Sequence, residues 1–119
     1  MKAQFNHLDS VEQLEEVFTE SNETPQFIFK HSLTCPISAD VYQEIKNVDG
    51  TVNLIVVQTA RDVSSEVAAK TGLRHESPQA IVLEHGKPVY HAAHYDISAD
   101  DVNAKLNNSN GKRKMENGK

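Results

Sequence analysis

The hydrophobic positions of the chain recur with two spacings, one typical of amphipathic helices and one typical of strands buried on both faces. The segment VEQLEEVFTE begins at residue 11 and carries four apolar residues on one helical face: Val11, Leu14, Val17 and Phe18. Ser10 precedes this segment and Gln13 follows three places later, which is the spacing of a capping box. Two nearly continuous apolar runs, FIFKH at 27–31 and VNLIVVQ at 52–58, predict strands that are covered from both sides.

Three further segments predict helices, and one predicts a hairpin. PISADVYQEIKNV at 36–48 opens with a proline, which the first helical turn tolerates, and DVSSEVAAKTG at 62–72 ends at a glycine stop. SADDVNAKL at 98–106 has Ser98 as its expected N-cap. QAIVLEHGKPVYHAA at 79–93 contains two strand-like runs around EHGK, a turn suited to antiparallel pairing.

These elements predict an α/β domain with a mixed, four-stranded sheet and helices on both faces. Strands joined through a helix are expected to be parallel with a right-handed crossover, while the hairpin adds antiparallel strands. A chain of 119 residues has room for one domain, which we place at 1–107. Residues 108–119 are polar without apolar periodicity and predict a disordered C-terminal tail.

Charge and composition exclude several classes of function. The net charge is -5 and the only basic run lies in the last few residues, so a nucleic-acid-binding surface is not expected. No segment has the apolar character of a signal peptide or a membrane span, which favours a cytoplasmic protein. We also expect a monomer without a membrane or nucleic-acid partner. His91 and His94 have a spacing that binds metal on a helix, but their segment predicts strand and loop, so no metal site is expected.

Cys35 is the only cysteine, and it lies in SLTCPIS where a predicted strand ends and a helix begins. Unpaired N–H groups and the positive end of the helix dipole favour the thiolate there, and the thiolate is the form that attacks disulfides. Pro36 loses no hydrogen bond at the first helical position and fixes how the helix leaves the cysteine. A lone cysteine in a cytosolic protein can equally be a small buried hydrophobe, so the spacing alone leaves both interpretations open.

The order of these elements resembles the thioredoxin fold over residues 8–107. The residues that carry the resemblance are TCPIS at the strand-to-helix junction, SPQAIVL before the hairpin, and the EHGK turn. Pro78, before a strand, could be an ordinary strand-entry residue or a cis proline. In the thioredoxin fold the proline is cis and lies beside the active cysteine. More narrowly, FIFKHSLTCPIS, YHAAHYDIS and the short length resemble the monothiol bacilliredoxin family of YtxJ type.

This resemblance implies a thiol–disulfide oxidoreductase that removes bacillithiol from S-bacillithiolated cytosolic proteins under oxidative stress, through a mixed disulfide at Cys35. Bacillithiol is then a co-substrate, and no tightly bound cofactor is expected. Ser38 stands where dithiol thioredoxins carry the resolving cysteine, so an outside low-molecular-weight thiol must release Cys35. Thr34, Pro36 and Ser38 are expected to support the site, with Ser38 either as a donor to the thiolate or as an ordinary first-turn polar residue.

Substrate binding calls for a cation, because bacillithiol carries the carboxylates of malate. Lys30, at the end of the first strand, is the candidate, although a strand-edge lysine is more often only solvated. His31 could also touch the site, and the backbone of Ser77 beside Pro78 could pair with the cysteinyl segment of the substrate. Two alternatives to an enzyme stay open: a non-catalytic thioredoxin-like binding module, and a redox sensor that dimerises through Cys35.

Overall fold

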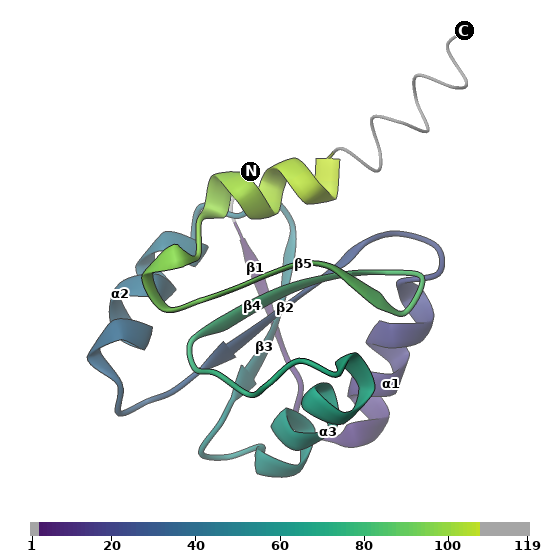
Figure 1. The fold of residues 1–119 in the computed structure, drawn as a ribbon, viewed down its shortest axis with the longest axis horizontal. Coiled ribbons are helices and arrows are strands. Elements are labelled where there is room, and N and C mark those ends of the chain that lie inside the picture. Colours follow the sequence, from purple (N-terminus) through teal and green to yellow (C-terminus); the bar gives the residue numbers. More distant parts are fainter. Residues whose placement is uncertain (1–2, 108–119) are drawn as a thin grey trace, which may run out of the picture.

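A five-stranded mixed sheet forms the centre of the computed structural model, which describes residues 3–107 (Figure 1). The strands lie in the spatial order β1-β3-β2-β4-β5. Their bounds are Gln4–His7 for β1, Gln26–His31 for β2, Thr51–Val56 for β3, Gln79–Glu84 for β4 and Lys87–Ala93 for β5. Both β1 and β2 pair with β3 in parallel, whereas β4 pairs antiparallel with β2 and β5 antiparallel with β4. The tail predicted at 108–119 lies outside the described residues.

Helices cover both faces of this sheet. They are α1 (Val11–Glu20), α2 (Pro36–Ile45), α3 (Arg61–Thr71), the short 3-10 helix η1 (His94–Asp96) and a final helix over 99–107. One apolar core lies between the sheet and α2 with the final helix, and a second lies between the sheet and α1 with α3. The predicted α/β class with helices on both faces is confirmed. Among residues 3–107, no helix has both the length and the apolar character that crossing a membrane requires.

The expectation of four strands is wrong by one, because the sequence pattern did not reveal β1. This strand is only four residues long, QFNH, and all of them except Phe5 are exposed. It lies at the edge of the sheet, where Gln4 to His7 pair with Thr51 to Leu54 of β3. A short edge strand that buries almost nothing has no apolar run from which it could be predicted.

The predicted ends of several elements are confirmed at the level of single hydrogen bonds. The backbone N–H of Gln13 donates to Ser10 Oγ at 3.2 Å, and the Ser10 N–H donates to Gln13 Oε1 at 3.2 Å, so the capping box is complete. Gly72 ends α3 with a φ of 75°. In the hairpin turn, His85 and Gly86 have φ values of 56° and 75°, the paired positive values that a tight two-residue turn requires.

The strand β2 explains why a continuous apolar run predicted two-sided burial. Phe27 and Phe29 belong to the core under α2, and Ile28 belongs to the core under α1 and α3. Side chains alternate along a strand, so Lys30 follows Ile28 onto the second face, where it is fully buried. Both faces of β2 are therefore packed in the core, and this strand leads directly into the segment that contains Cys35.

Candidate functional site

Cys35 is the N-cap residue of α2, four residues beyond the end of β2. Its backbone is extended, with φ of -102° and ψ of 118°, and its carbonyl accepts the first helical hydrogen bond from Ala39 N at 3.1 Å. Pro36 occupies the first helical position, as predicted. The sulfur belongs to a free, partly exposed cysteine. The geometry therefore places one accessible thiol at the positive end of a ten-residue helix.

The surroundings of the sulfur lower the pKa of Cys35 below its ordinary value. The largest cause is the hydrogen bond from the Ser38 backbone N–H; desolvation opposes it, and the Ile37 N–H and the Ser38 hydroxyl add to the lowering. Donors of this kind stabilise the charged thiolate more than the neutral thiol. The structure thus supplies the N–H groups on which the predicted thiolate depends.

Ser38 joins the cysteine to the segment that precedes it. Its side chain is fully buried, and Ser38 Oγ accepts the backbone N–H of Ser32 at 3.3 Å. The hydroxyl proton stays free to point toward Cys35, because an oxygen that accepts one hydrogen bond can still donate its own. Ser38 is thus a buried polar residue of the first helical turn, and its hydroxyl is the smallest of the causes that lower the pKa of Cys35.

Gln58 is a site residue that the sequence analysis did not identify. Its Nε2 donates to Ser32 Oγ at 2.8 Å and to Thr34 Oγ1 at 3.3 Å, while its Oε1 accepts the Leu33 N–H at 3.0 Å. One amide side chain therefore holds all three residues of the loop before Cys35. The available signal was a glutamine two residues after the end of β3, a strand parallel to β2, since parallel strands end at the same edge of a sheet.

Lys30 does not lie where the sequence analysis placed it. The lysine is fully buried rather than partly exposed; its Nζ donates to the Ser64 carbonyl at 3.0 Å and lies 3.1 Å from His75 Nδ1. Burial lowers the pKa of Lys30 to about 8. The side chain faces α3, whereas Cys35 begins α2 on the other face. The expected exposed cation for a substrate carboxylate is therefore wrong for this residue.

Ser77 and Pro78 form a cis peptide bond, as the resemblance implied. Pro78 is buried, and its carbonyl accepts the backbone N–H of His94 at 3.1 Å. In Figure 1 the start of α2, the loop before β4 and η1 lie together at the left end of the sheet. A hydrogen bond of 2.7 Å from Tyr95 Oη to Asp40 Oδ2 ties η1 to α2. The cis-proline loop and the cysteine helix thus share one end of the molecule.

The three histidines named from the sequence, His31, His91 and His94, have different surroundings. His31 is half-buried on the α2 side, with its ring centroid 5.1 Å from that of Tyr42, and burial lowers its pKa. His94 Nε2 lies 3.8 Å from Glu76 Oε1, and His91 is exposed on β5. Within residues 3–107, no three His, Cys, Asp or Glu side chains gather in a group that could hold a metal ion.

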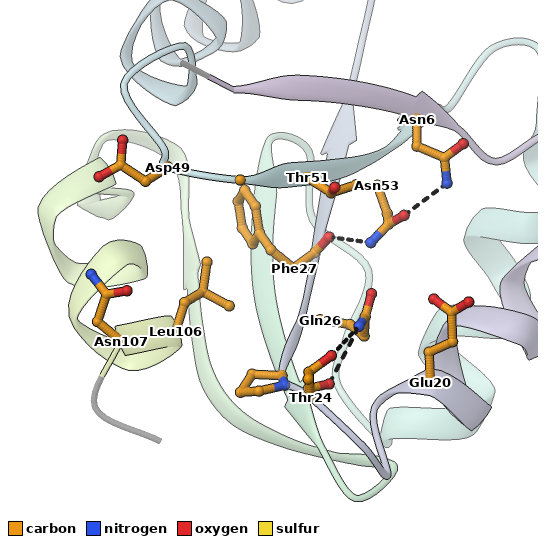
Figure 2. Close-up of a pocket in the computed structure, with 12 residues that line it drawn as sticks. Asn6, Glu20, Thr24, Gln26, Phe27, Asp49, Thr51, Asn53, Leu106 and Asn107 are labelled. Carbon is orange, nitrogen blue, oxygen red and sulfur yellow. Dashed lines mark hydrogen bonds between the residues drawn. The ribbon is translucent and has the colours of Figure 1, made fainter. Parts of the chain in front are cut away.

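A pocket of about 350 Å³ lies at the opposite end of the sheet from the thiol (Figure 2). Its wall includes the first two residues of β2, Gln26 and Phe27, whereas Cys35 follows the other end of that strand. Asn6 Nδ2 donates to Asn53 Oδ1 at 2.9 Å, and Asn53 Nδ2 donates to the Phe27 carbonyl at 3.0 Å. These groups satisfy one another's hydrogen bonds across three strands. Because the pocket lies at the far end of the sheet, we assign it no role in chemistry at Cys35.

Solved structures with a similar arrangement define the class of this protein. A proposed oxidoreductase with a thioredoxin fold matches with a TM-score of 0.73 and 36% sequence identity, covering 82% of this chain and 89% of the other. Thioredoxin from Trypanosoma brucei brucei matches with a TM-score of 0.68 and 14% identity, over 88% of this chain and 89% of that one. Malassezia sympodialis thioredoxin has a TM-score of 0.66 and 12% identity, over 88% and 90%. The fold is that of thioredoxin.

The sequence assigns the chain to one family among proteins with the thioredoxin fold. Residues 6–102 match the model of the family described as monothiol bacilliredoxin BrxC. The chain belongs to this family, and the predicted resemblance is confirmed. Family and fold together identify a thiol–disulfide oxidoreductase.

Proposed function

We propose that this protein removes bacillithiol from S-bacillithiolated proteins of the cytoplasm through a mixed disulfide at Cys35. The observation that carries the proposal is the position of the only sulfur nucleophile in the chain. Cys35 lies at a helix N-terminus with the Ser38 and Ile37 N–H groups lowering its pKa, and no second cysteine exists to resolve a captured disulfide. Membership of the monothiol bacilliredoxin family supports bacillithiol as the thiol that is captured.

The first half-reaction is a disulfide exchange. The Cys35 thiolate attacks the bacillithiol sulfur of the modified protein, the disulfide bond breaks, and the protein thiolate leaves and takes a proton from water. One disulfide is consumed and one is formed, so no outside oxidant or reductant is needed. The product is Cys35 joined to bacillithiol by a disulfide.

The second half-reaction restores the enzyme. Ser38 has no sulfur, so a low-molecular-weight thiol, as its thiolate, attacks the bacillithiol sulfur and displaces Cys35. The Ser38 and Ile37 N–H groups that stabilise the thiolate make Cys35 a good leaving group in this step. Bacillithiol therefore enters as a co-substrate, with no resident cofactor in the scheme.

Release of a reduced peptide tests this function. A peptide carrying bacillithiol on its single cysteine is mixed with reduced protein, and free peptide is measured over time. We expect release by the native chain and by Ser38→Ala, and none by Cys35→Ser. A native chain that releases no more peptide than Cys35→Ser would overturn the proposal and favour the binding-module alternative.

A further inference from the structure

Tyr95 is the most exposed large hydrophobic side chain among residues 3–107. Its side chain is 65% exposed, yet its hydroxyl is fixed by the hydrogen bond of 2.7 Å to Asp40 Oδ2. The aromatic ring therefore stands in solvent in a defined position. A ring that is already held in place loses little conformational freedom when a ligand packs against it, which favours binding.

The short helix η1 holds Tyr95 between the two parts of the site. On one side, the backbone N–H of His94 donates to the carbonyl of Pro78 in the cis-proline loop at 3.1 Å. On the other side, η1 packs against α2, and Asp40 lies five positions after Cys35 on that helix. His94 itself has a φ of 57°, a backbone conformation that is uncommon for a residue with a side chain. The turn at His94 thus directs Tyr95 toward the cysteine helix.

Tyr95 also lies close to the sulfur. The sulfur of Cys35 stands over the first turn of α2, where it accepts the backbone N–H groups of Ser38 and Ile37. The pKa of Tyr95 is raised, first by its hydrogen bond to Asp40, then by desolvation, by the charge of Asp40 and by the charge of the Cys35 thiolate. Salt and water screen the interaction of exposed charges that are far apart, so an effect of the thiolate requires a short separation. A small thiol joined to Cys35 therefore comes within reach of the Tyr95 ring.

The Tyr95 ring and the Asp40 carboxylate together offer two kinds of contact. Because Asp40 occupies the hydroxyl, a ligand meets the apolar ring of Tyr95. Asp40 is exposed and accepts no other hydrogen bond within the described residues, although a carboxylate can accept several. A sugar matches both groups, with C–H bonds on one face for the ring and hydroxyl donors for the carboxylate. An apolar side chain would cover the ring and leave the carboxylate without donors.

We propose that the Tyr95 ring stacks on the glucosamine ring of bacillithiol when the sulfur of bacillithiol is joined to Cys35, with Asp40 accepting hydrogen bonds from the sugar hydroxyls. The inference rests on the proposed function and names the residues that give it specificity. In bacillithiol an amide joins the sugar directly to the cysteinyl part, so the sugar lies only a few bonds from the sulfur. Thiols without a sugar, such as cysteine and glutathione, cannot make this contact.

The kinetic test uses one peptide that carries bacillithiol, cysteinylglucosamine or cysteine in disulfide linkage. Cysteinylglucosamine has the sugar but no malate, so it isolates the contact with the sugar. Tyr95→Leu keeps an apolar side chain and removes the aromatic ring, and it should slow peptide release from the two sugar-bearing thiols by about two- to tenfold. Release from the cysteine disulfide should be unchanged. Val89→Ala, which truncates an exposed apolar side chain on β5, is the control and should change none of the three rates.

NMR of the Cys35–bacillithiol mixed disulfide, prepared chemically from bacillithiol disulfide, tests the contact without turnover. The ring current of an aromatic side chain moves protons above its face upfield. The sugar C–H protons of the native adduct should therefore lie upfield of those in the Tyr95→Leu adduct. Tyr95→Phe keeps the ring and loses only the hydrogen bond to Asp40, so its adduct should retain part of this shift. Identical sugar resonances in the native and Tyr95→Leu adducts would overturn the inference.

The outcomes separate this contact from the proposed function. Equal slowing of all three disulfides by Tyr95→Leu would assign the ring to the peptide or to the sulfur and overturn the inference, even if the native chain removes bacillithiol. The absence of slowing for any of them would overturn it as well. A native chain that releases no peptide, but whose adduct shows the upfield sugar resonances, would support the contact and contradict the proposed function.

Discussion

Replacing Gln58 by leucine removes the side chain that holds the loop before Cys35 while keeping a residue of similar size. Two of its hydrogen bonds have good lengths, 2.8 Å to Ser32 Oγ and 3.0 Å from the Leu33 N–H, and the third, to Thr34, is longer at 3.3 Å. A hydrogen bond contributes about 0.5–1.5 kcal/mol net, and water can partly replace these bonds because the loop is largely exposed. We therefore expect the free energy of unfolding to fall by about 1–2 kcal/mol.

The same substitution should raise the pKa of Cys35 toward that of free cysteine. A loop released at 32–34 holds the sulfur less firmly against the Ser38 and Ile37 N–H groups, which lower that pKa. A change of one pH unit in a pKa corresponds to about 1.4 kcal/mol. The free energy of the lost hydrogen bonds is divided between the stability of the fold and the stabilisation of the thiolate. We therefore expect the pKa of Cys35 to rise by less than about one pH unit.

Thiolate absorbance as a function of pH, together with urea unfolding, measures both effects. Gln43→Leu is the matched control, because Gln43 is an exposed glutamine on α2 and the same change there should leave the pKa of Cys35 unaltered. If Gln58→Leu loses stability but titrates like the native chain, Gln58 is only structural. The positioning of the thiolate by this loop would then be refuted.

Three further results are expected. Ser38→Ala should raise the pKa of Cys35, because the hydroxyl is one of the donors that lower it. Titration of the thiolate should show only a small rise, because the backbone N–H groups of Ser38 and Ile37 remain in the variant. Burial holds the pKa of Lys30 at about 8, below its usual 10.5, so the unfolded chain binds more protons between these values and stability should rise with pH there. Urea unfolding at each pH should show that the free energy of unfolding rises more steeply with pH in the native chain than in Lys30→Met. The same pH dependence in both proteins would contradict the burial of Lys30. Asn53→Leu should lower the free energy of unfolding by about 1–2 kcal/mol, since it removes the hydrogen bonds of the Asn53 amide to the Phe27 carbonyl and to Asn6, with bacillithiol release per folded molecule unchanged.

Much of the fold followed from local patterns, because capping, turn and strand signals act over a few residues. The Ser10 capping box, the Gly72 stop and the tight turn at His85 and Gly86 are all confirmed. The position of Cys35 at a helix start could also be predicted, because a buried run directly before a proline-led helix fixes the junction. The strand β1 could not be predicted, since its edge position leaves most of it exposed and its pairing depends on distant β3.

The residues around the site were predicted less well, because their roles depend on long-range contacts. The run FIFKH does not reveal which residues of β2 face α2 and which face α3. It therefore could not predict that Lys30 is buried against α3. Gln58 reaches the Cys35 loop only because β2 and β3 end side by side, although Gln58 and Leu33 are 25 positions apart in the chain.

The central claim is that Cys35 captures bacillithiol itself, and the intact mass of the protein tests it most directly. Reduced protein is mixed with a bacillithiolated peptide, quenched with acid, and weighed by mass spectrometry with the Cys35→Ser variant alongside. The account predicts one added bacillithiol on Cys35, an equal amount of free peptide, and no adduct on the variant. A native protein that carries the peptide in place of bacillithiol, or that carries neither, would contradict it.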